Sequence, residues 1–245
     1  MPELPEPSGA VIYHPFAALG LPPVVVALAE ASASQPGADV TANTTANATA
    51  AQRKRPRPGE RRLQILQTLA LMLQEPGADR ITTAALAARL VVSEAALYRH
   101  FASKAQMFEA LIEFIESSVF SLINQITERA DQPAAQAQRI VLVLLQFGEK
   151  NPGMVRVMVG DALVFEHERL MQRMHQFFDR VEGQLRQCLR VAGDVAGDAT
   201  PSAHAQALAS GLTALVVGRL QRFARSGFRR SPTEHLDSLL AHWLP

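Results

Sequence analysis

The sequence has few of the features that mark exported or membrane-bound proteins. It contains one cysteine, Cys188, so no disulfide can form within the chain, and this favours a reducing cytoplasm. No apolar run reaches the roughly 20 residues that a membrane-spanning helix needs. The first 52 residues contain no Lys or Arg, so the apolar segment 19–29 lacks the basic region of a secretory signal. We therefore expect a cytoplasmic protein.

Catalytic and metal-binding motifs are also missing. The seven histidines show no HExxH or similar ligand spacing, and the chain has neither a GxSxG elbow nor a P-loop. His167 and His175 are eight residues apart on one predicted helix and could join Glu166 or Glu168. A solvated helix face explains such a pattern better than a site does. We expect no enzyme activity, no metal and no cofactor.

Composition divides the chain into three parts. Five of the 15 prolines lie in the first 22 positions. Residues 31–51 are almost all Ala, Ser, Thr, Asn, Gln and Gly. Such a segment buries too little apolar surface to offset its ordering entropy. The prediction is a disordered low-complexity extension at 1–52, a DNA-binding domain with a basic N-terminal arm at 53–104, and a helical dimerisation and partner-binding domain at 105–245.

Charge is distributed unevenly along the chain, although the total is only +1. Residues 1–52 carry four acidic and no basic side chains, which gives −4. Residues 53–104 carry ten basic and four acidic side chains, which gives +6, and residues 105–245 carry 14 basic and 15 acidic ones, which gives −1. The positive charge is therefore concentrated in one short segment, as a polyanionic partner requires.

The segment 81–104, ITTAALAARLVVSEAALYRHFASK, predicts two short helices joined by a tight turn. Thr82 or Thr83 can cap the first helix, and Ser93 can cap a second one that ends near His100. The second helix exposes small, hydroxylated and cationic side chains, which suits a helix lying in a major groove. An ordinary helical hairpin is the alternative, and the flanking charge argues against it.

The run RKRPRPGERR at 53–62 directly precedes the first helix of this domain. A basic arm there can follow the DNA backbone or enter a minor groove, although a solvated tail remains the alternative. Lys104 opposes the dipole of the helix that it begins, which is better explained with a phosphate nearby. The candidate DNA-binding residues are Thr82, Thr83, Ser93, Glu94, Ala95, Ala96, Tyr98, Arg99, His100, Lys104, Arg53, Arg55, Arg61 and Arg62.

The rest of the chain has the apolar period of helices, so the predicted fold is all-α, a three-helix helix-turn-helix head followed by a helical bundle. One helix is expected to close the head, and the turn-rich stretch AGDVAGDAT at 192–200 should be a loop. The predicted helices span 59–74, 103–128, 133–150, a short one up to 160, 166–191, 201–225 and 232–243.

A stripe of small residues runs along one face of the predicted helix 201–225: Ala207, Gly211, Ala214 and Gly218. Each glycine inside a helix costs about 1 kcal/mol relative to alanine. Close approach of another helix would offset that cost, either from a two-fold partner or from the same subunit. A homodimer would place two short recognition helices about 34–36 Å apart on one duplex.

These residues resemble the TetR family of bacterial regulators, which join a three-helix DNA-binding head to a helical body that dimerises through its last two helices. The resemblance spans about residues 53–243 and points to the members of that family that act in nucleoid occlusion. It is carried by RRLQILQTLALML, RITTAALAARLVVSEAALYRHFASKAQMFEALIEFIE, FGEKNPG, ALVFEHERL, QLRQ and RFARSGFRRSPTE.

The resemblance implies a protein that binds palindromic chromosomal sites, with more than one dimer able to load per site. It also implies binding of the C-terminal tail of the division protein FtsZ, so that the division ring does not assemble over the nucleoid. The tail would lie between the predicted helices 103–128 and 133–150. The positions carried over are Phe114, Leu122, Val143, Gln146, Lys150 and Asn151. The alternative for Phe114 and Val143 is a place in the core.

The sequence departs from the family pattern in the turn and in the groove. Val91 replaces the usual turn glycine, which would cost about 1–2 kcal/mol if that position needs positive φ. Ala85 stands where a basic residue is common, and Leu122 and Gln146 differ in character from the expected residues. A ligand-responsive repressor on the same scaffold is the alternative function, with a small-molecule pocket in the body.

Overall fold

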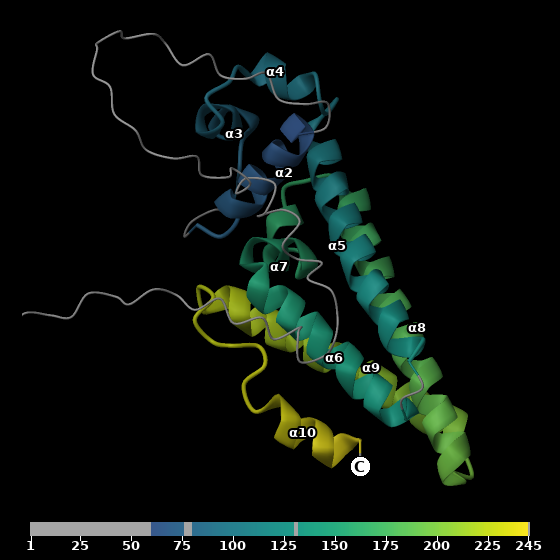
Figure 1. The fold of residues 1–245 in the computed structure, drawn as a ribbon. Coiled ribbons are helices and arrows are strands. Elements are labelled where there is room, and N and C mark those ends of the chain that lie inside the picture. The colour runs from purple at the N-terminus through teal and green to yellow at the C-terminus, as the bar shows by residue number, and fades with distance from the viewer. Residues whose placement is uncertain (1–59, 76–79, 130–131, 245) are drawn as a thin grey trace, which may run out of the picture. The chain divides into compact units, whose positions relative to one another are not determined.

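The computed structural model describes residues 60–75, 80–129 and 132–244 (Figure 1). This part of the chain is helical and contains no strand, which confirms the predicted all-α class. The predicted extension 1–52, with Arg53 and Arg55 of the arm, lies outside the described residues. The elements are α2 (Glu60–Met72), α3 (Thr83–Arg89), α4 (Glu94–Tyr98), α5 (Lys104–Thr127), α6 (Pro133–Lys150), α7 (Pro152–Met158), the 3₁₀ turn η2 (Asp161–Leu163), α8 (Glu168–Ala196), α9 (Pro201–Arg225) and α10 (Leu236–Trp243).

The head is built from α2, α3 and α4, which pack on one another through a small apolar core. Ile65 and Leu69 of α2 meet this core, as do Leu86 of α3 and Leu97 of α4, and none of them is more than 1% exposed. Phe101, just after α4, is equally buried. Burial of each such side chain contributes about 1.5–3 kcal/mol. Because α4 buries only Leu97, its other side chains remain on the surface.

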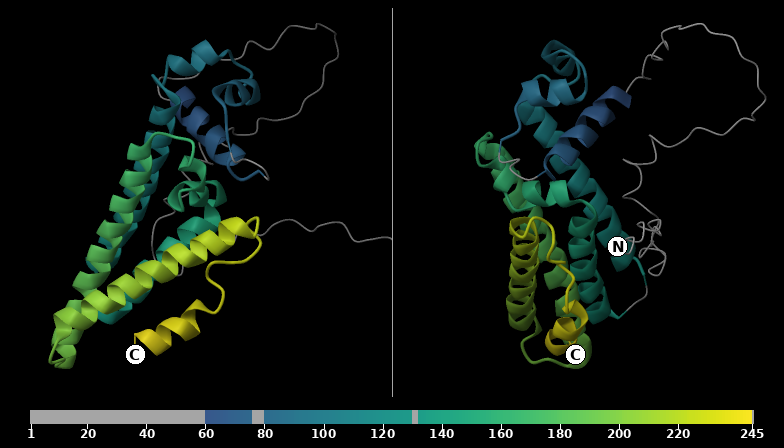
Figure 2. Two further views of the ribbon diagram at one scale, coloured as in Figure 1. Left: turned by 180° about the vertical axis from the view of Figure 1, so that it is seen from behind. Right: turned by 90° about the vertical axis from the view of Figure 1, so that its left-hand side faces the viewer.

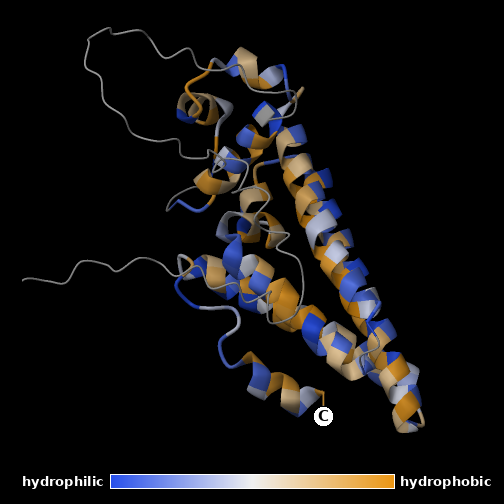
Figure 3. Ribbon diagram, in the orientation of Figure 1, coloured by the Kyte–Doolittle hydropathy of each residue, from blue (hydrophilic) through white to orange (hydrophobic). Residues whose placement is uncertain are grey.

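The body is a layered packing of long helices in which α8 lies along α9 and α5 (Figures 1 and 2). Helix α6 contacts α5, α8 and α9, and it buries Ile140, Val141, Val143, Leu144 and Leu145 completely. Hydrophobic and hydrophilic residues alternate along α5 and α8, as expected of amphipathic helices (Figure 3). None of the helices within the described residues combines the length and apolar character needed to cross a bilayer.

A glycine brings the head and the body together. Helix α7 packs against α2, and a Cβ placed on Gly153 would lie 2.0 Å from the carbonyl oxygen of Ala70. No side chain fits in that gap, so the close approach of α7 to α2 requires glycine at this position. The break at Asn151-Pro152, which the sequence predicts, puts Gly153 in the first turn of α7.

Two predicted boundaries near the C-terminus are wrong. Helix α8 continues through the turn-rich stretch to Ala196 and ends at Gly197, which has φ of 73°. The amide of Asp198 donates to the carbonyl of Gly193 at 3.0 Å, the bond of a Schellman cap, and Arg190 pairs with Asp194 one turn earlier at 3.0 Å. A Cβ on Gly193 would be 3.0 Å from that of Pro201, so the glycine allows α9 to begin close by.

The last helix begins at Leu236 and not at Pro232. The guanidinium of Arg219 donates to the carbonyls of Pro232 and Glu234 at 3.0 and 2.7 Å. Those carbonyls are therefore bound by a side chain, and His235 takes a left-handed conformation with φ of 55°. Other predicted bounds are as the structure has them: both ends of 133–150, both ends of 201–225 and the end at Trp243. Ser103, the predicted start of the next helix, is the cap of α5, which begins at Lys104.

Candidate nucleic-acid interface

Helices α3 and α4 each begin at a hydroxyl cap. The Oγ1 of Thr82 accepts a hydrogen bond from the amide of Ala85 at 3.1 Å, and the Oγ of Ser93 accepts from the amide of Ala96 at 3.3 Å. Each cap satisfies an amide that the helix itself leaves unpaired. The sequence predicted the Ser93 cap and left the first cap open between Thr82 and Thr83, and the structure has it at Thr82. Thr82 fixes where α3 begins, and Ser93 fixes where α4 begins.

Val91 in this turn has φ of 54°, in the region that normally requires glycine. Its amide donates to the carbonyl of Ala88 and that of Val92 to the carbonyl of Ala87, so the turn closes α3 despite the β-branched side chain. Val91 is 72% exposed and gains little from packing. The strain expected from the replaced glycine is therefore present, at a cost of about 1–2 kcal/mol.

Helix α4 presents a cationic and polar surface. Tyr98 is 46% exposed, and Arg99 and His100 are exposed beside it, while Leu97 alone anchors the helix inward. Ala95 is exposed and Ala96 half-buried, so no bulky side chain blocks approach of the backbone to a groove. A helix held this way can enter a major groove and place cations near phosphates.

The hydroxyls of this unit are not equally free to donate. Thr82 and Ser93 use an oxygen lone pair for capping, and each keeps its O–H for another acceptor. Thr83 instead donates its O–H to the carboxylate of Glu94 at 2.6 Å, a bond between α3 and α4. Thr83 and Glu94, both predicted to face DNA, are thus engaged with each other in the free protein.

Lys104, predicted to contact a phosphate, has a partner within the protein. Its ammonium forms an ion pair with Glu166, which lies just before α8, and its Nζ is 5.6 Å from the centre of the Phe108 ring. The side chains of Lys104 and Glu166 are only 23% and 10% exposed. Glu166 therefore provides the negative charge that the sequence led us to expect from DNA.

The two arginines of the basic arm that the structure describes belong to α2. Arg61 donates to Gln64 one turn along at 2.8 Å. Arg62 donates to the carbonyl of His100 at 2.9 Å, and its guanidinium carbon lies 4.1 Å from the centre of the Phe101 ring. Arg62 thus fastens α2 to the end of α4 in the free protein.

Two further cations of the head were missed by the sequence analysis. Arg89, the last residue of α3, pairs with Glu75 at 2.6 Å, and both side chains are about half exposed. The guanidinium of Arg80 lies 6.0 Å from the ring of Phe165, which is 67% exposed next to Glu166. No local pattern reveals these contacts, because the partners come from different elements. The segment before α8 thus touches the head at Arg80 and Lys104.

The predicted partner groove between α5 and α6 needs correction. Leu122 and Val143 are 1% and 0% exposed, so both are core residues and the assignment of their side chains to a peptide-binding surface is wrong. Phe114 is half-buried on the same face of α5 as Leu122, two turns earlier. Val143 is therefore a core residue, which was the alternative to a place in the groove, whereas Phe114 is only partly in the core.

The remaining groove positions lie at the end of α6. The Oε1 of Gln146 is buried and has no hydrogen-bond partner. Lys150, one turn further on, is exposed, and its pKa is lowered by partial burial against the opposing effect of Glu149. The side-chain amide of Asn151 donates to the carbonyl of Phe147 at 2.8 Å. These side chains offer an acceptor and a cation at one helix end.

The small-residue stripe of α9 has open space above it. A Cβ on Gly218 would meet nothing within 4 Å, and one on Gly211 would meet only Trp243, at 3.8 Å. Ala207 and Ala214 are exposed. Gly183 of the adjoining α8 is equally open. Within the described residues, Trp243 of α10 alone comes within 4 Å of a Cβ at these glycines, so close packing inside this part of the subunit does not explain the stripe.

A capped helix-turn-helix with an exposed, cationic second helix, mounted on an all-helical body, defines a DNA-binding regulator. Two family models match the chain: "Bacterial regulatory proteins, tetR family" at residues 65–111, and the SlmA-like "Tetracyclin repressor-like, C-terminal domain" at residues 132–243. The nucleoid occlusion factors SlmA of Escherichia fergusonii and Citrobacter koseri are each 50% identical over 179 residues, which cover 73% of this chain and 90% of theirs. The chain belongs to the TetR family, within its SlmA group of nucleoid occlusion factors.

Solved structures share the fold at low identity. The MbdR regulator of Azoarcus sp. CIB matches with a TM-score of 0.61 and 20% identity, covering 74% of this chain and 95% of that one. The transcriptional regulator FadR of Bacillus subtilis, solved in complex with stearoyl-CoA, matches with a TM-score of 0.58 and 13% identity, covering 74% and 97%. These matches establish the architecture alone.

Proposed function

We propose that this protein is a nucleoid occlusion factor that binds palindromic chromosomal sites as a dimer and, while on DNA, opposes assembly of FtsZ over the nucleoid. The observation that carries the proposal is the 50% identity to SlmA proteins across both the head and the body. The body of a regulator varies with its partner, so likeness there bears on function and not only on fold. The protein would work in the cytoplasm on the nucleoid.

The head would read DNA through α4. In the proposed pose, Ala95 and Ala96 approach base edges, while Tyr98 and His100 position phosphates. Ser93 caps α4 and keeps its hydroxyl hydrogen for a phosphate oxygen. This pose places the positive end of α4 toward the duplex, which favours the polyanion.

The dimer would form through α8 and α9. The open glycines of α9 and Gly183 of α8 allow the backbones of a second copy to come close, as small residues do wherever helices pack tightly. Two heads held by one symmetric interface would occupy half-sites about one helical turn of DNA apart. A single α4 of five residues reads too little sequence for specific binding on its own.

The FtsZ tail would bind where α5 and α6 present Phe114, Gln146, Lys150 and Asn151. The buried, unpaired Oε1 of Gln146 supports this assignment, because such an acceptor costs about 1–3 kcal/mol until a donor reaches it. A peptide amide would supply the donor, Phe114 an apolar contact, and Lys150 a partner for an acidic group.

The proposal is tested by co-sedimentation of the full chain with polymerising FtsZ, with and without DNA sites selected by this protein. We expect less sedimented FtsZ when the DNA-bound protein is present. Lys150→Glu should lose this effect and keep DNA binding, while Arg229→Glu, the same charge change at an exposed position outside α8 and α9, should keep both. Unchanged FtsZ sedimentation with the unaltered protein on DNA would contradict the proposal.

A ligand-responsive repressor is the second candidate, and one observation favours it. An apolar cavity of about 680 Å³ lies among the ends of α6, α8 and α9, with Trp243 and Leu244 on one side. Its volume is within the range of small-molecule sites. A metabolite that raised the Tm and released the protein from DNA, in the absence of any effect on FtsZ, would select this candidate.

A further inference from the structure

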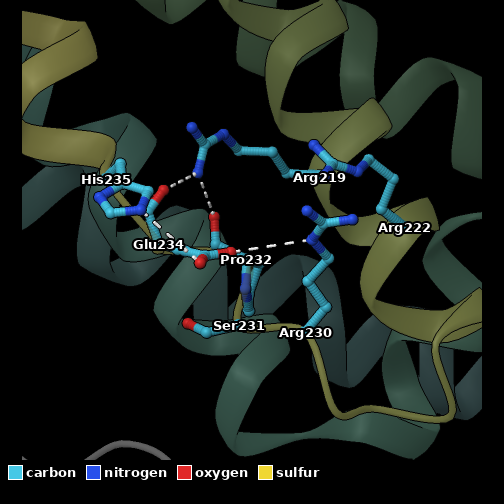
Figure 4. Close-up of a pocket in the computed structure, with 7 residues that line it drawn as sticks. All are labelled: Arg219, Arg222, Arg230, Ser231, Pro232, Glu234 and His235. Carbon is cyan, nitrogen blue, oxygen red and sulfur yellow. Dashed lines mark hydrogen bonds and ion pairs between the residues drawn. The ribbon is translucent and has the colours of Figure 1, made fainter.

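Three arginines line one cavity in the body, away from the helix-turn-helix. The cavity has a volume of about 250 Å³ and lies between the C-terminal half of α9 and the segment that connects α9 to α10 (Figure 4). Arg219 and Arg222 come from α9, and Arg230 comes from the connecting segment. Glu234 is the only acidic residue in the lining, so the cavity carries a net charge of +2.

Arg219 is held in place by the backbone opposite it. One nitrogen of its guanidinium, Nη1, donates to the carbonyls of Pro232 and Glu234 at 3.0 and 2.7 Å, as Figure 4 shows. A guanidinium has five N–H groups, and these two bonds use only the Nη1 pair. The Nε and Nη2 hydrogens of Arg219 remain for a ligand, on a side chain that is already positioned.

The positive charges of these three arginines are not neutralised by close acidic partners. Burial, together with the positive charge of Arg222, lowers the pKa of Arg219. Arg230 reaches Glu234 only at 3.7 Å, longer than a hydrogen bond. Within the described residues the side chain of Arg222 has neither a hydrogen bond nor an ion pair. Bringing these like charges together costs free energy that a bound anion would recover.

The wall opposite α9 contains a strained residue. His235 lines the cavity with φ of 55°, a left-handed conformation that is strained for a residue with a side chain. The bond from Arg219 to the carbonyl of Glu234 holds this turn in place. Strain of this kind gathers at ligand-binding positions, where the surrounding contacts fix one geometry.

We propose that this cavity binds a small, multiply charged phosphate group, such as the diphosphate of a soluble metabolite. The planar fork of a guanidinium matches the oxygens of a phosphate, and three such forks converge here from two elements. The volume is below that of most drug-sized sites, so it suits a compact diphosphate better than a whole nucleotide. A recessed cavity of this size also fits a small anion better than a duplex backbone.

Inorganic pyrophosphate is the probe for this site, titrated calorimetrically into the full chain, with sulfate at equal ionic strength as the reference. We expect saturable binding of pyrophosphate that is at least tenfold tighter than that of sulfate. Arg222→Gln and Arg230→Gln should each weaken it about tenfold, the loss of one charge-assisted contact. Both side chains are exposed, so the variants should fold normally.

Arg225→Gln is the matched control, because Arg225 is exposed on the same helix and does not line the cavity. It should change pyrophosphate binding less than twofold, with sedimentation confirming the oligomeric state of every variant. Equal weakening by Arg225→Gln, or pyrophosphate bound no more tightly than sulfate, would overturn the proposal. Displacement of pyrophosphate by duplex DNA of unrelated sequence would also overturn it, and would assign these arginines to nucleic acid.

Discussion

The ammonium of Lys104, in the first turn of α5, is paired with the carboxylate of Glu166, just before α8. The pair joins the end of the DNA-binding head to the start of a long body helix, 62 residues further along the chain. Because both side chains are largely buried, the pair is little screened by salt. Any role of Lys104 at a phosphate must therefore compete with Glu166.

Glu166→Gln should strengthen DNA binding, because it releases Lys104 for a phosphate. We expect the affinity to rise severalfold for all DNA sequences alike. The slope of log affinity against log salt concentration should steepen by up to about one unit, as for one added phosphate contact. Lys104→Ala should have the opposite effect and should also lower the free energy of unfolding by about 1–3 kcal/mol, since Glu166 loses its partner. Fluorescence anisotropy over a salt series, with urea unfolding of each variant, measures both effects.

The double variant Lys104→Ala/Glu166→Gln separates these effects. It should recover much of the lost stability, because no charge is left without a partner, and should bind DNA as weakly as Lys104→Ala does. If all three variants bound DNA like the unaltered protein, Lys104 would not contact a phosphate, and the contact predicted for it from the sequence would be wrong.

Val91→Gly should stabilise the protein. Relief of the left-handed strain gives about 1–2 kcal/mol, and the extra freedom of glycine in the unfolded chain removes about 0.5–1 kcal/mol of that gain. Urea unfolding should show a net increase of roughly 0.5–1 kcal/mol. Val92→Gly, next in the chain and without positive φ, is the control and should destabilise. A less stable Val91→Gly would show that the turn is not strained.

Gly153→Ala should loosen the junction between head and body. The added methyl group would lie 2.0 Å from the carbonyl oxygen of Ala70, which is backbone and cannot turn aside. Relief requires α7 to move away from α2, at a cost of about 1–3 kcal/mol or more. Thermal unfolding measures the loss. An unchanged Tm would mean that α2 and α7 are farther apart in solution.

Leucine at both open glycines of α9 should separate the dimer. Gly211→Leu/Gly218→Leu places two large side chains where a second copy would approach, so sedimentation should show monomers and DNA binding should fall together. Ser202→Leu is the control, on an exposed position about 140° around the helix from Ala207. A double variant that remained fully dimeric would place the interface elsewhere.

The stability of the start of α9 should fall at acidic pH. The amide of Thr200 donates to Asp198 at 2.9 Å, and this bond, followed by that from His204, lowers the pKa of Asp198. A carboxyl whose pKa is lowered by folding stabilises the folded protein at pH values above its unfolded pKa of about 3.8. This stabilisation is lost as the pH falls through the pKa of the folded state. The free energy of unfolding, measured with urea, should therefore fall less between pH 7 and pH 2.5 for Asp198→Asn than for the unaltered protein. An equal loss in both proteins would assign the acid sensitivity to other groups.

Local signals predicted much of this fold because they act through adjacent residues. Thr82, Ser93 and Ser103 cap the helices that their positions indicate, and the prolines at 133 and 201 begin the helices expected from them. The strain at Val91 was expected from the resemblance, because valine stands where the family has a turn glycine, and the positive φ is present. In each case the interacting groups lie within a few residues, so the sequence pattern contains them.

The misses come from contacts between distant segments. Nothing near Lys104 in the sequence indicates Glu166, and nothing near Arg62 indicates the carbonyl of His100. Leu122 and Val143 are buried because of how α5 and α6 are rotated about their axes against the rest of the body. An amphipathic pattern fixes that rotation only to within about one residue. The resemblance supplied candidate positions there, and packing decided which of them reach the surface.

The central claim is that two α4 helices of one symmetric dimer read one duplex. Hydroxyl-radical footprinting of the full chain, on sites selected from random-sequence DNA, tests it most directly. The account predicts a palindrome whose two protected half-sites have centres about 34–36 Å apart on one face of the duplex. Selected sites without two-fold symmetry, or one protected patch per bound protein, would contradict it.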